Sequence, residues 1–262
     1  MKTTLGLTLL LFATLFSCMR QEKPLPAELS RAESVMWEHP DSALSILRSM
    51  PQSSLSIGKN YATWALLLAQ ARDKVYGKRL PDSLNIPSSD KLVQDAMDYF
   101  EKEGDLKRMA QTYYYKGQLL KDQKKITEAM PFFLKSKEMM TKLDEPLFTY
   151  LICQSLGNMY RYQDLYEESL VQLKDAYQYA LRSGNGERIS YALSELGRTY
   201  VHKNEMDSAL FYFGKSLDNA QRLGNIELEA MAMGELGVVY NKLSQGEKAL
   251  HYTRKELDLC LQ

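Results

Sequence analysis

The side chains that most often carry out catalysis or bind metal are few and widely separated in this sequence. The three histidines, His39, His202 and His251, stand alone, and no His-Glu-x-x-His, Cys-x-x-Cys or Gly-x-Ser-x-Gly arrangement occurs. The lone Gly-x-Gly at 184–186 follows no expected strand, so it does not predict a phosphate-binding loop. We therefore expect no catalytic residue, no metal site, no cofactor and no small-molecule substrate.

Cys18 is the cysteine whose surroundings predict a chemical modification. A lysine near the N-terminus is followed by an apolar run at 5–16, and Ser17 precedes the cysteine. This run has the length of a signal-peptide core and is too short to span a bilayer. The segment resembles the lipobox of bacterial lipoproteins, although Phe16 stands where that pattern prefers a small residue.

The lipoprotein resemblance implies a signal peptide over 1–17 and a lipid on Cys18, which would be the first residue of the mature chain. It further implies export and a lipid anchor in a bacterial envelope membrane, in the periplasm or at the outer membrane. Residues 18–27 contain two prolines and several charges, which indicates a tether. An ordinary secretory signal with an incidental cysteine is the alternative.

Composition limits the remaining functions. The chain has 262 residues, with 33 basic and 33 acidic side chains, so no net charge attracts a polyanion and nucleic acid is not an expected partner. Glycine and proline are scarce, at 14 and 8 residues, which favours helix.

A repeat of 40 residues organises the chain from about position 90 onward. Glycine recurs in one register: Gly117, Gly157, Gly197 and Gly237. Small residues occupy two further registers: Ala129, Ser169, Ala209, Ala249, and Ala96, Ser136, Ala176, Ser216. A fourth register suits helix ends in the left-handed conformation: Gly104, Asp144, Gly184 and Gly224.

Each repeat is predicted to be an antiparallel pair of helices. Apolar residues recur at helical spacing around each glycine, and a second amphipathic stretch follows, such as 207–223. Glycine on the first helix and a small residue on the second allow the two backbones to approach closely. Because one pair cannot bury its apolar faces alone, the pairs must stack.

The pattern Leu-Gly-x-x-Tyr, followed by a small residue twelve positions after the glycine, resembles the tetratricopeptide repeat (TPR). It is present at 156–160, 196–200 and 236–240. The period of 40 exceeds the usual period of about 34 residues, and the family's early tryptophan is absent. The resemblance implies an all-α solenoid of stacked helical hairpins, as in bacterial TPR lipoproteins of the Bacteroidetes type.

Within that fold we expect divergent hairpins over 28–106 and four regular repeats over 107–262. In the first part, helices are expected at 28–38, from Pro40 onward, at 61–76 and at 90–103. In the last repeat, Glu256 replaces the small residue of its register. The resemblance places a following hairpin against that position, so the glutamate predicts that the array ends there.

The TPR resemblance also implies a peptide groove lined by the first helix of each repeat. The candidate groove residues are Tyr114, Gln118, Lys121, Gln154, Asn158, Arg161, Arg198, His202, Asn241 and Lys242. Their lysines and arginines suggest a mild basic bias. A solvated helix face with no ligand is the alternative interpretation.

Together these features predict a non-enzymatic TPR scaffold or adaptor that binds a protein or peptide partner at the cell envelope. One alternative is the periplasmic sensor part of a membrane-bound signalling or transcriptional regulator. Another is a glycan-uptake lipoprotein, for which Trp37 and Trp64 would be the two indole platforms.

Overall fold

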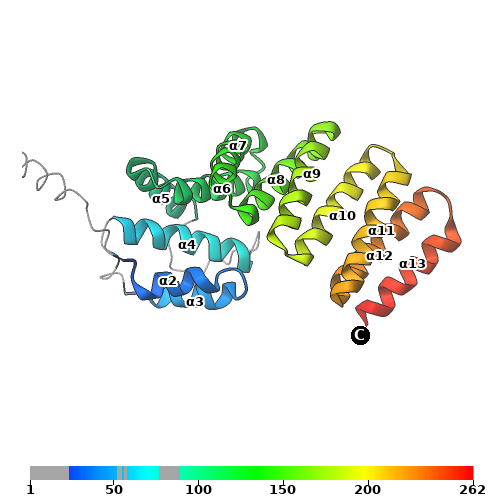
Figure 1. Cartoon of the computed structure of the whole chain (residues 1–262), viewed down its shortest axis with the longest axis horizontal. Coiled ribbons are helices and arrows are strands. Elements are labelled where there is room, and N and C mark those ends of the chain that lie inside the picture. The colour runs from blue at the N-terminus through cyan, green and yellow to red at the C-terminus, as the bar shows by residue number, and fades with distance from the viewer. Residues whose placement is uncertain (1–23, 52–54, 56–57, 77–88, 262) are drawn as a thin grey trace, which may run out of the picture.

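A computed structural model describes residues 24–51, 55, 58–76 and 89–261 of the chain. Throughout these ranges the regular structure is helical, and consecutive helices pair into a row of hairpins (Figure 1). The predicted signal peptide and Cys18 lie outside the described residues.

The hairpins follow the chain in order. The first part holds α2 (Ala27–Val35) with α3 (Pro40–Ser49), then α4 (Lys59–Tyr76) with α5 (Ser89–Glu103). The regular repeats are α6 (Leu106–Asp122) with α7 (Ile126–Lys142), α8 (Pro146–Tyr162) with α9 (Tyr166–Ser183), α10 (Gly186–His202) with α11 (Met206–Leu223), and α12 (Ile226–Lys242) with α13 (Gly246–Cys260). The all-α solenoid that the repeat predicts is thus confirmed.

The ends of the helices follow local chemistry. Asp105, Asn185 and Asn225 each accept a hydrogen bond from a backbone N–H in the first turn of the helix they precede, which satisfies a donor that has no partner within the helix. The register predicted for left-handed helix ends is confirmed, because φ is positive at all four of its positions: 74°, 54°, 67° and 62° in chain order.

A second left-handed register was not predicted. It lies in the turn inside each regular hairpin, at residues that are not glycine: Lys124, Asp164, Asn204 and Ser244. In the first of these turns the N–H of Lys125 donates to the carbonyl of Leu120 at 2.9 Å, and the N–H of Lys124 donates to that of Lys121. The bonds satisfy carbonyl groups at the end of the helix and explain why the chain tolerates the strained residue.

The register glycines lie where the two helices of a hairpin come closest. A Cβ atom added at Gly197 would lie 2.5 Å from the ring of Phe213, and one at Gly157 would lie 2.5 Å from Leu173. The space that three of the register glycines leave is therefore filled by a large side chain of the second helix, and Thr253 lies in the equivalent place beside Gly237, whereas we expected only two small residues facing each other. The small residues of the second helix are buried beside this contact.

The other small register also packs within its own hairpin. Ser136 of α7 donates a hydrogen bond to the carbonyl of Ala110 in α6 at 2.6 Å. Glu256 of α13 occupies the equivalent position, and its carboxylate lies 2.5 Å from where a Cβ of Gly234 in α12 would be. Glu256 therefore faces its own partner helix, which removes the reason for expecting it to block a following hairpin.

The first hairpin does more than stack on its neighbour. α2 and α3 lie along α4 (Figure 1), and the end of α2 also contacts helices far along the chain. Arg108 Nη2 of α6 lies 2.6 Å from Glu33 Oε2 of α2, and the Trp37 ring meets the Phe148 ring of α8 edge to face at 5.5 Å. The N-terminal hairpin is thus tied to the first turns of later repeats.

Candidate functional site

A row of alternating charges runs across the first helices of three consecutive repeats. Arg161 Nη1 of α8 lies 2.6 Å from Glu195 Oε2 of α10, and Glu195 Oε1 lies 2.7 Å from Arg198 Nη1. Arg198 Nη2 reaches across to Glu235 Oε1 of α12 at 2.5 Å. We call these four residues the charge ladder. It compensates the two arginines that suggested a basic groove.

Burial sets the electrostatics of the ladder. The side chains of Arg161 and Glu195 are 9% and 10% exposed, so their ion pair is shielded from water. Burial raises the pKa of Glu235, and the nearby Arg198 only partly offsets this effect. Burial lowers the pKa of Arg198, but the Glu235 and Glu195 carboxylates outweigh it, so that pKa is raised.

A pocket of about 430 Å³ opens beside the last ladder residue, between α10, α11, α12 and α13. We call it the α12 pocket. Its lining combines apolar side chains with the end of the ladder: Arg198, Val201, His202, Phe213, Met231, Gly234, Glu235, Val238 and Glu256. Ligand pockets in proteins have volumes of about 300–1,000 Å³, so this one can hold a side chain or a small group.

The inner face nearer the N-terminus is occupied by the chain itself. Lys74 Nζ of α4 lies 3.5 Å from the centre of the Trp37 ring, and the Arg188 guanidinium lies 5.3 Å from the same ring. Burial, with a further contribution from the charge of Arg188, lowers the pKa of Lys74 to about 8. Trp37, Lys74 and Arg188 therefore cover one another on this part of the inner face.

Neither tryptophan is open for stacking on a sugar. Trp37 is covered by the two cations just described. Trp64 is buried in the core, and its Nε1 donates a hydrogen bond to the carbonyl of Leu47 at 2.9 Å. The glycan interpretation depended on these two rings as platforms for stacking on a sugar, and neither ring is available for that role.

Three predicted groove residues of α6 lie away from the α12 pocket. Tyr114 is 4% exposed, and its ring packs against those of Phe133 and Phe148. Gln118 donates to the Tyr114 hydroxyl at 3.0 Å and accepts from Lys121 Nζ. These side chains bind one another and the core.

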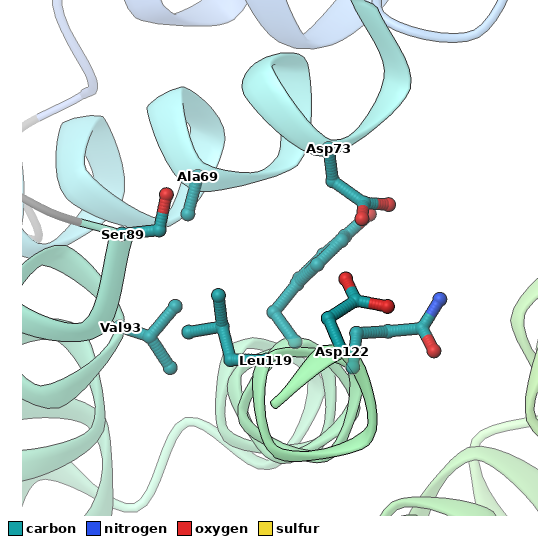
Figure 2. A pocket seen from close by; sticks show the side chains of 8 residues that line it. Ala69, Asp73, Ser89, Val93, Leu119 and Asp122 are labelled. Atoms are coloured by element: carbon teal, nitrogen blue, oxygen red, sulfur yellow. The ribbon is translucent and has the colours of Figure 1, made fainter. Parts of the chain in front are cut away.

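Gln118 also lines a cavity of about 40 Å³ between α4, α5 and α6. Figure 2 shows Asp73 of α4 and Asp122 of α6 pointing toward it from opposite sides. Burial raises the pKa of Asp73, and the nearby Lys121 charge opposes this shift. A space of this size admits water but no organic substrate, so two carboxylates here do not make an active site.

The other predicted residues divide between the ladder and the surface. Arg161 and Arg198 belong to the ladder, and His202 lines the α12 pocket with its ring 6.2 Å from that of Tyr166. Four lie outside both: Gln154 and the half-buried Asn158 on α8, and the exposed Asn241 and Lys242 at the end of α12. The structure thus brings together three of the ten candidates.

The predicted groove residues do not include the acidic side of the site. Glu195 and Glu235 lie 40 residues apart in one register, and the two earlier repeats place Tyr115 and Ser155 there. Glu256 breaks a register of small residues. Those departures from the repeat were the available signal, because a carboxylate in a position that is otherwise apolar or small needs a reason to be there.

The remaining chemistry-bearing residues do not assemble. In the described part of the chain, no group of three or more His, Cys, Asp or Glu side chains has a geometry that could hold a metal ion. Burial raises the pKa of Cys153 to about 12, so this thiol is not an activated nucleophile. Among the helices that the structure describes, none is both long and apolar enough to cross a membrane.

Comparison with known proteins finds similarity in structure and none in sequence. No protein-family model matches the chain, and no curated protein matches it in sequence. Solved structures do. The apo form of RapI superposes with a TM-score of 0.70 at 15% identity, over 88% of this chain and 64% of RapI.

Two further structures agree. The type IV pilus biogenesis factor PilW has a TM-score of 0.60 at 17% identity, over 90% of this chain and 97% of PilW. A signal-transduction ATPase with a tetratricopeptide repeat sensor, from Pyrococcus horikoshii, has a TM-score of 0.66 at 18% identity. That match covers 85% of this chain and 34% of the ATPase.

The chain has the TPR-like fold. Its 40-residue hairpins are longer than the usual TPR unit of about 34 residues, yet the consecutive pairs stack in the same manner. In a TPR-like solenoid the first helices line the inner face, and here the contacts between α8, α10 and α12 form that face. The charge ladder and the α12 pocket lie on it.

Proposed function

We propose that this TPR-like protein is a non-enzymatic scaffold or adaptor that binds a protein or peptide partner through its inner face at α10, α12 and α13. The observation that carries the proposal is the α12 pocket, which opens where the inner face is not filled by the N-terminal hairpin. Val238 on its wall is 55% exposed, so the pocket presents apolar surface that a partner could cover.

Site-specific photo-cross-linking tests this proposal in the cells that produce the protein. A photoreactive amino acid replaces Val238 in one variant and Phe211 in the control, because both side chains are 55% exposed but Phe211 lies on the second helix α11. We expect a discrete cross-linked product at position 238 and none at 211. Equal products at both positions, or none at 238, would contradict a partner on the inner face.

The proposed location rests on the sequence. The apolar run at 5–16 and the Ser17-Cys18 pair support export and a lipid anchor on Cys18 in a bacterial envelope membrane. The test compares the wild type with Cys18→Ala after metabolic labelling with a fatty acid. We expect label and membrane retention in the wild type, and neither in the variant. A variant that stays with the membrane would remove the anchor from the proposal.

The alternative role is the periplasmic sensor part of a membrane-bound signalling or transcriptional regulator. It is supported by the similarity to the Pyrococcus horikoshii ATPase, in which a tetratricopeptide repeat sensor belongs to a longer chain. The adjacent coding sequence discriminates the two roles. A continuous reading frame that encodes an apolar membrane span and an output domain favours the sensor.

A further inference from the structure

We infer that the α12 pocket holds a cationic side chain, a lysine or an arginine, of the partner. This inference rests on the proposed function and specifies its ligand chemistry. It starts from the charges around the pocket. The ladder and the pocket wall together hold three carboxylates, those of Glu195, Glu235 and Glu256, but only the two guanidinium groups of the ladder, so the site has an excess of negative charge.

The first guanidinium is engaged by Glu195. Arg161 Nη1 contacts both Glu195 Oε2 and the Glu195 backbone carbonyl, at 2.6 and 3.4 Å, in a position shielded from water. Arg198 divides its two terminal nitrogens between Glu195 and Glu235. Neither arginine has a nitrogen directed at Glu256, so the ladder does not neutralise the carboxylate on the far side of the pocket.

The two pocket carboxylates differ in their partners. Both carboxylate oxygens of Glu235 are shielded from solvent, and one of them forms the ion pair with Arg198. In the part of the chain that the structure describes, no lysine or arginine lies within ion-pair distance of Glu256. A cationic group that enters the pocket would pair with the Glu256 carboxylate, for which the chain supplies no such partner.

The walls suit the aliphatic part of such a side chain. Val201, Met231 and Val238 line the pocket together with the ring of Phe213. Lysine and arginine cover apolar surface with their methylene groups while the charged end reaches polar partners. A purely apolar side chain would leave the Glu256 carboxylate without a cationic partner, and an acidic one would be repelled by it.

Selection from a phage-displayed library of random short peptides on the immobilised full chain tests the inference. We expect the enriched peptides to share a lysine or arginine beside apolar residues. In a synthetic copy of an enriched peptide, norleucine replaces the lysine, which keeps the aliphatic stem and removes the charge. Its affinity is expected to fall by about tenfold or more, as for loss of a hydrogen bond to a charged group.

Matched variants of the protein place the effect in the pocket. Glu256→Gln removes the charge of a residue at the pocket, whereas Glu247→Gln removes one from the exposed first turn of the same helix. We expect only Glu256→Gln to lower the affinity for the enriched peptides, by about tenfold. Because neither substitution touches the buried ladder, folding is retained, and circular dichroism verifies it.

The outcomes separate this inference from the function on which it rests. Two outcomes would contradict the inference that the pocket holds a cationic side chain: enriched peptides without a basic residue, or basic peptides that bind Glu256→Gln as tightly as the wild type. Either outcome would still leave the protein a peptide-binding protein. If no peptide is enriched and position 238 gives no cross-link, the proposed function itself is overturned.

Discussion

Arg161 and Glu195 form a buried ion pair that joins α8 to α10, with 2.6 Å between Nη1 and Oε2. Both side chains come from the inner face, yet both are almost completely shielded from water. The pair therefore connects two repeats and positions Glu195 to hold Arg198, which in turn reaches the pocket through Glu235. Stability and the shape of the binding face depend on the same four side chains.

Removing one partner of this pair is expected to be costly. Glu195→Ala leaves the Arg161 charge buried without compensation, which should lower the free energy of unfolding by about 3–5 kcal/mol. In the double variant Arg161→Met with Glu195→Leu, both charges are absent and most of that loss should be recovered. Urea denaturation gives the free energy of unfolding of the wild type, the single variant and the double variant. A double variant no more stable than Glu195→Ala would show that the charges are not the cause.

Two helical glycines, Gly197 in the register and Gly214 outside it, predict opposite effects of the same substitution. Gly197→Ala places a Cβ 2.5 Å from the Phe213 ring, so the helices must separate, at a cost of about 1–3 kcal/mol. Gly214→Ala in α11 meets no atom within 4 Å and should gain up to about 1 kcal/mol from helix propensity. Thermal unfolding distinguishes them. Stabilisation by Gly197→Ala would mean that the hairpin is not tightly packed there.

The left-handed turns offer a stabilising change. Lys124 has a φ of 63°, a conformation that costs a side chain with a Cβ roughly 1–2 kcal/mol. Lys124→Gly should raise the free energy of unfolding by about 0.5 kcal/mol after the entropy of glycine in the unfolded chain is subtracted. Asn204→Gly should gain less, because asparagine tolerates this region. Lys174→Gly, inside α9, is the control and should lose about 1 kcal/mol.

The lowered pKa of Lys74 makes the stability of the protein depend on pH. Its pKa is about 8 in the folded protein and 10.5 in the unfolded chain, so between these values the unfolded state binds more protons. The contribution of Lys74 to stability therefore rises with pH from about 8 toward 10.5. We expect the stability advantage of Lys74→Met over the wild type to shrink over that range in urea denaturation. A constant difference would show that the folded lysine titrates normally.

The hairpins were predictable because their signals are local. Gly197 and Ala209 lie where two adjacent helices pack together, and residues of the same kinds recur every 40 positions in the sequence. The helix expected over 28–38 ends at Val35, since Trp37 lies past its end and turns toward later repeats. That contact depends on the accumulated rotation of several stacked pairs, which no single repeat encodes.

The site was only partly predictable for a related reason. Arg161 and Arg198 can be assigned to first helices from their distance to the register glycines. Their compensation by Glu195 and Glu235 depends on how far neighbouring helices slide past each other, which the period does not specify. Comparing charges at equivalent positions of the first helices therefore indicated a mildly basic groove, whereas the structure pairs Arg161 and Arg198 with carboxylates in a neutral ladder.

The contact of Trp37 with Phe148 and Arg188 also has a consequence for how the chain unfolds. An ordinary solenoid has only nearest-neighbour interfaces, so its terminal repeats fray independently of the middle. Here the first hairpin is attached to α8 and α10, so it cannot detach without breaking contacts in the middle of the array. The contact joins separate units into one cooperative structure from α2 to α10, and the hairpin of α12 and α13, which forms the far wall of the α12 pocket, takes no part in that contact.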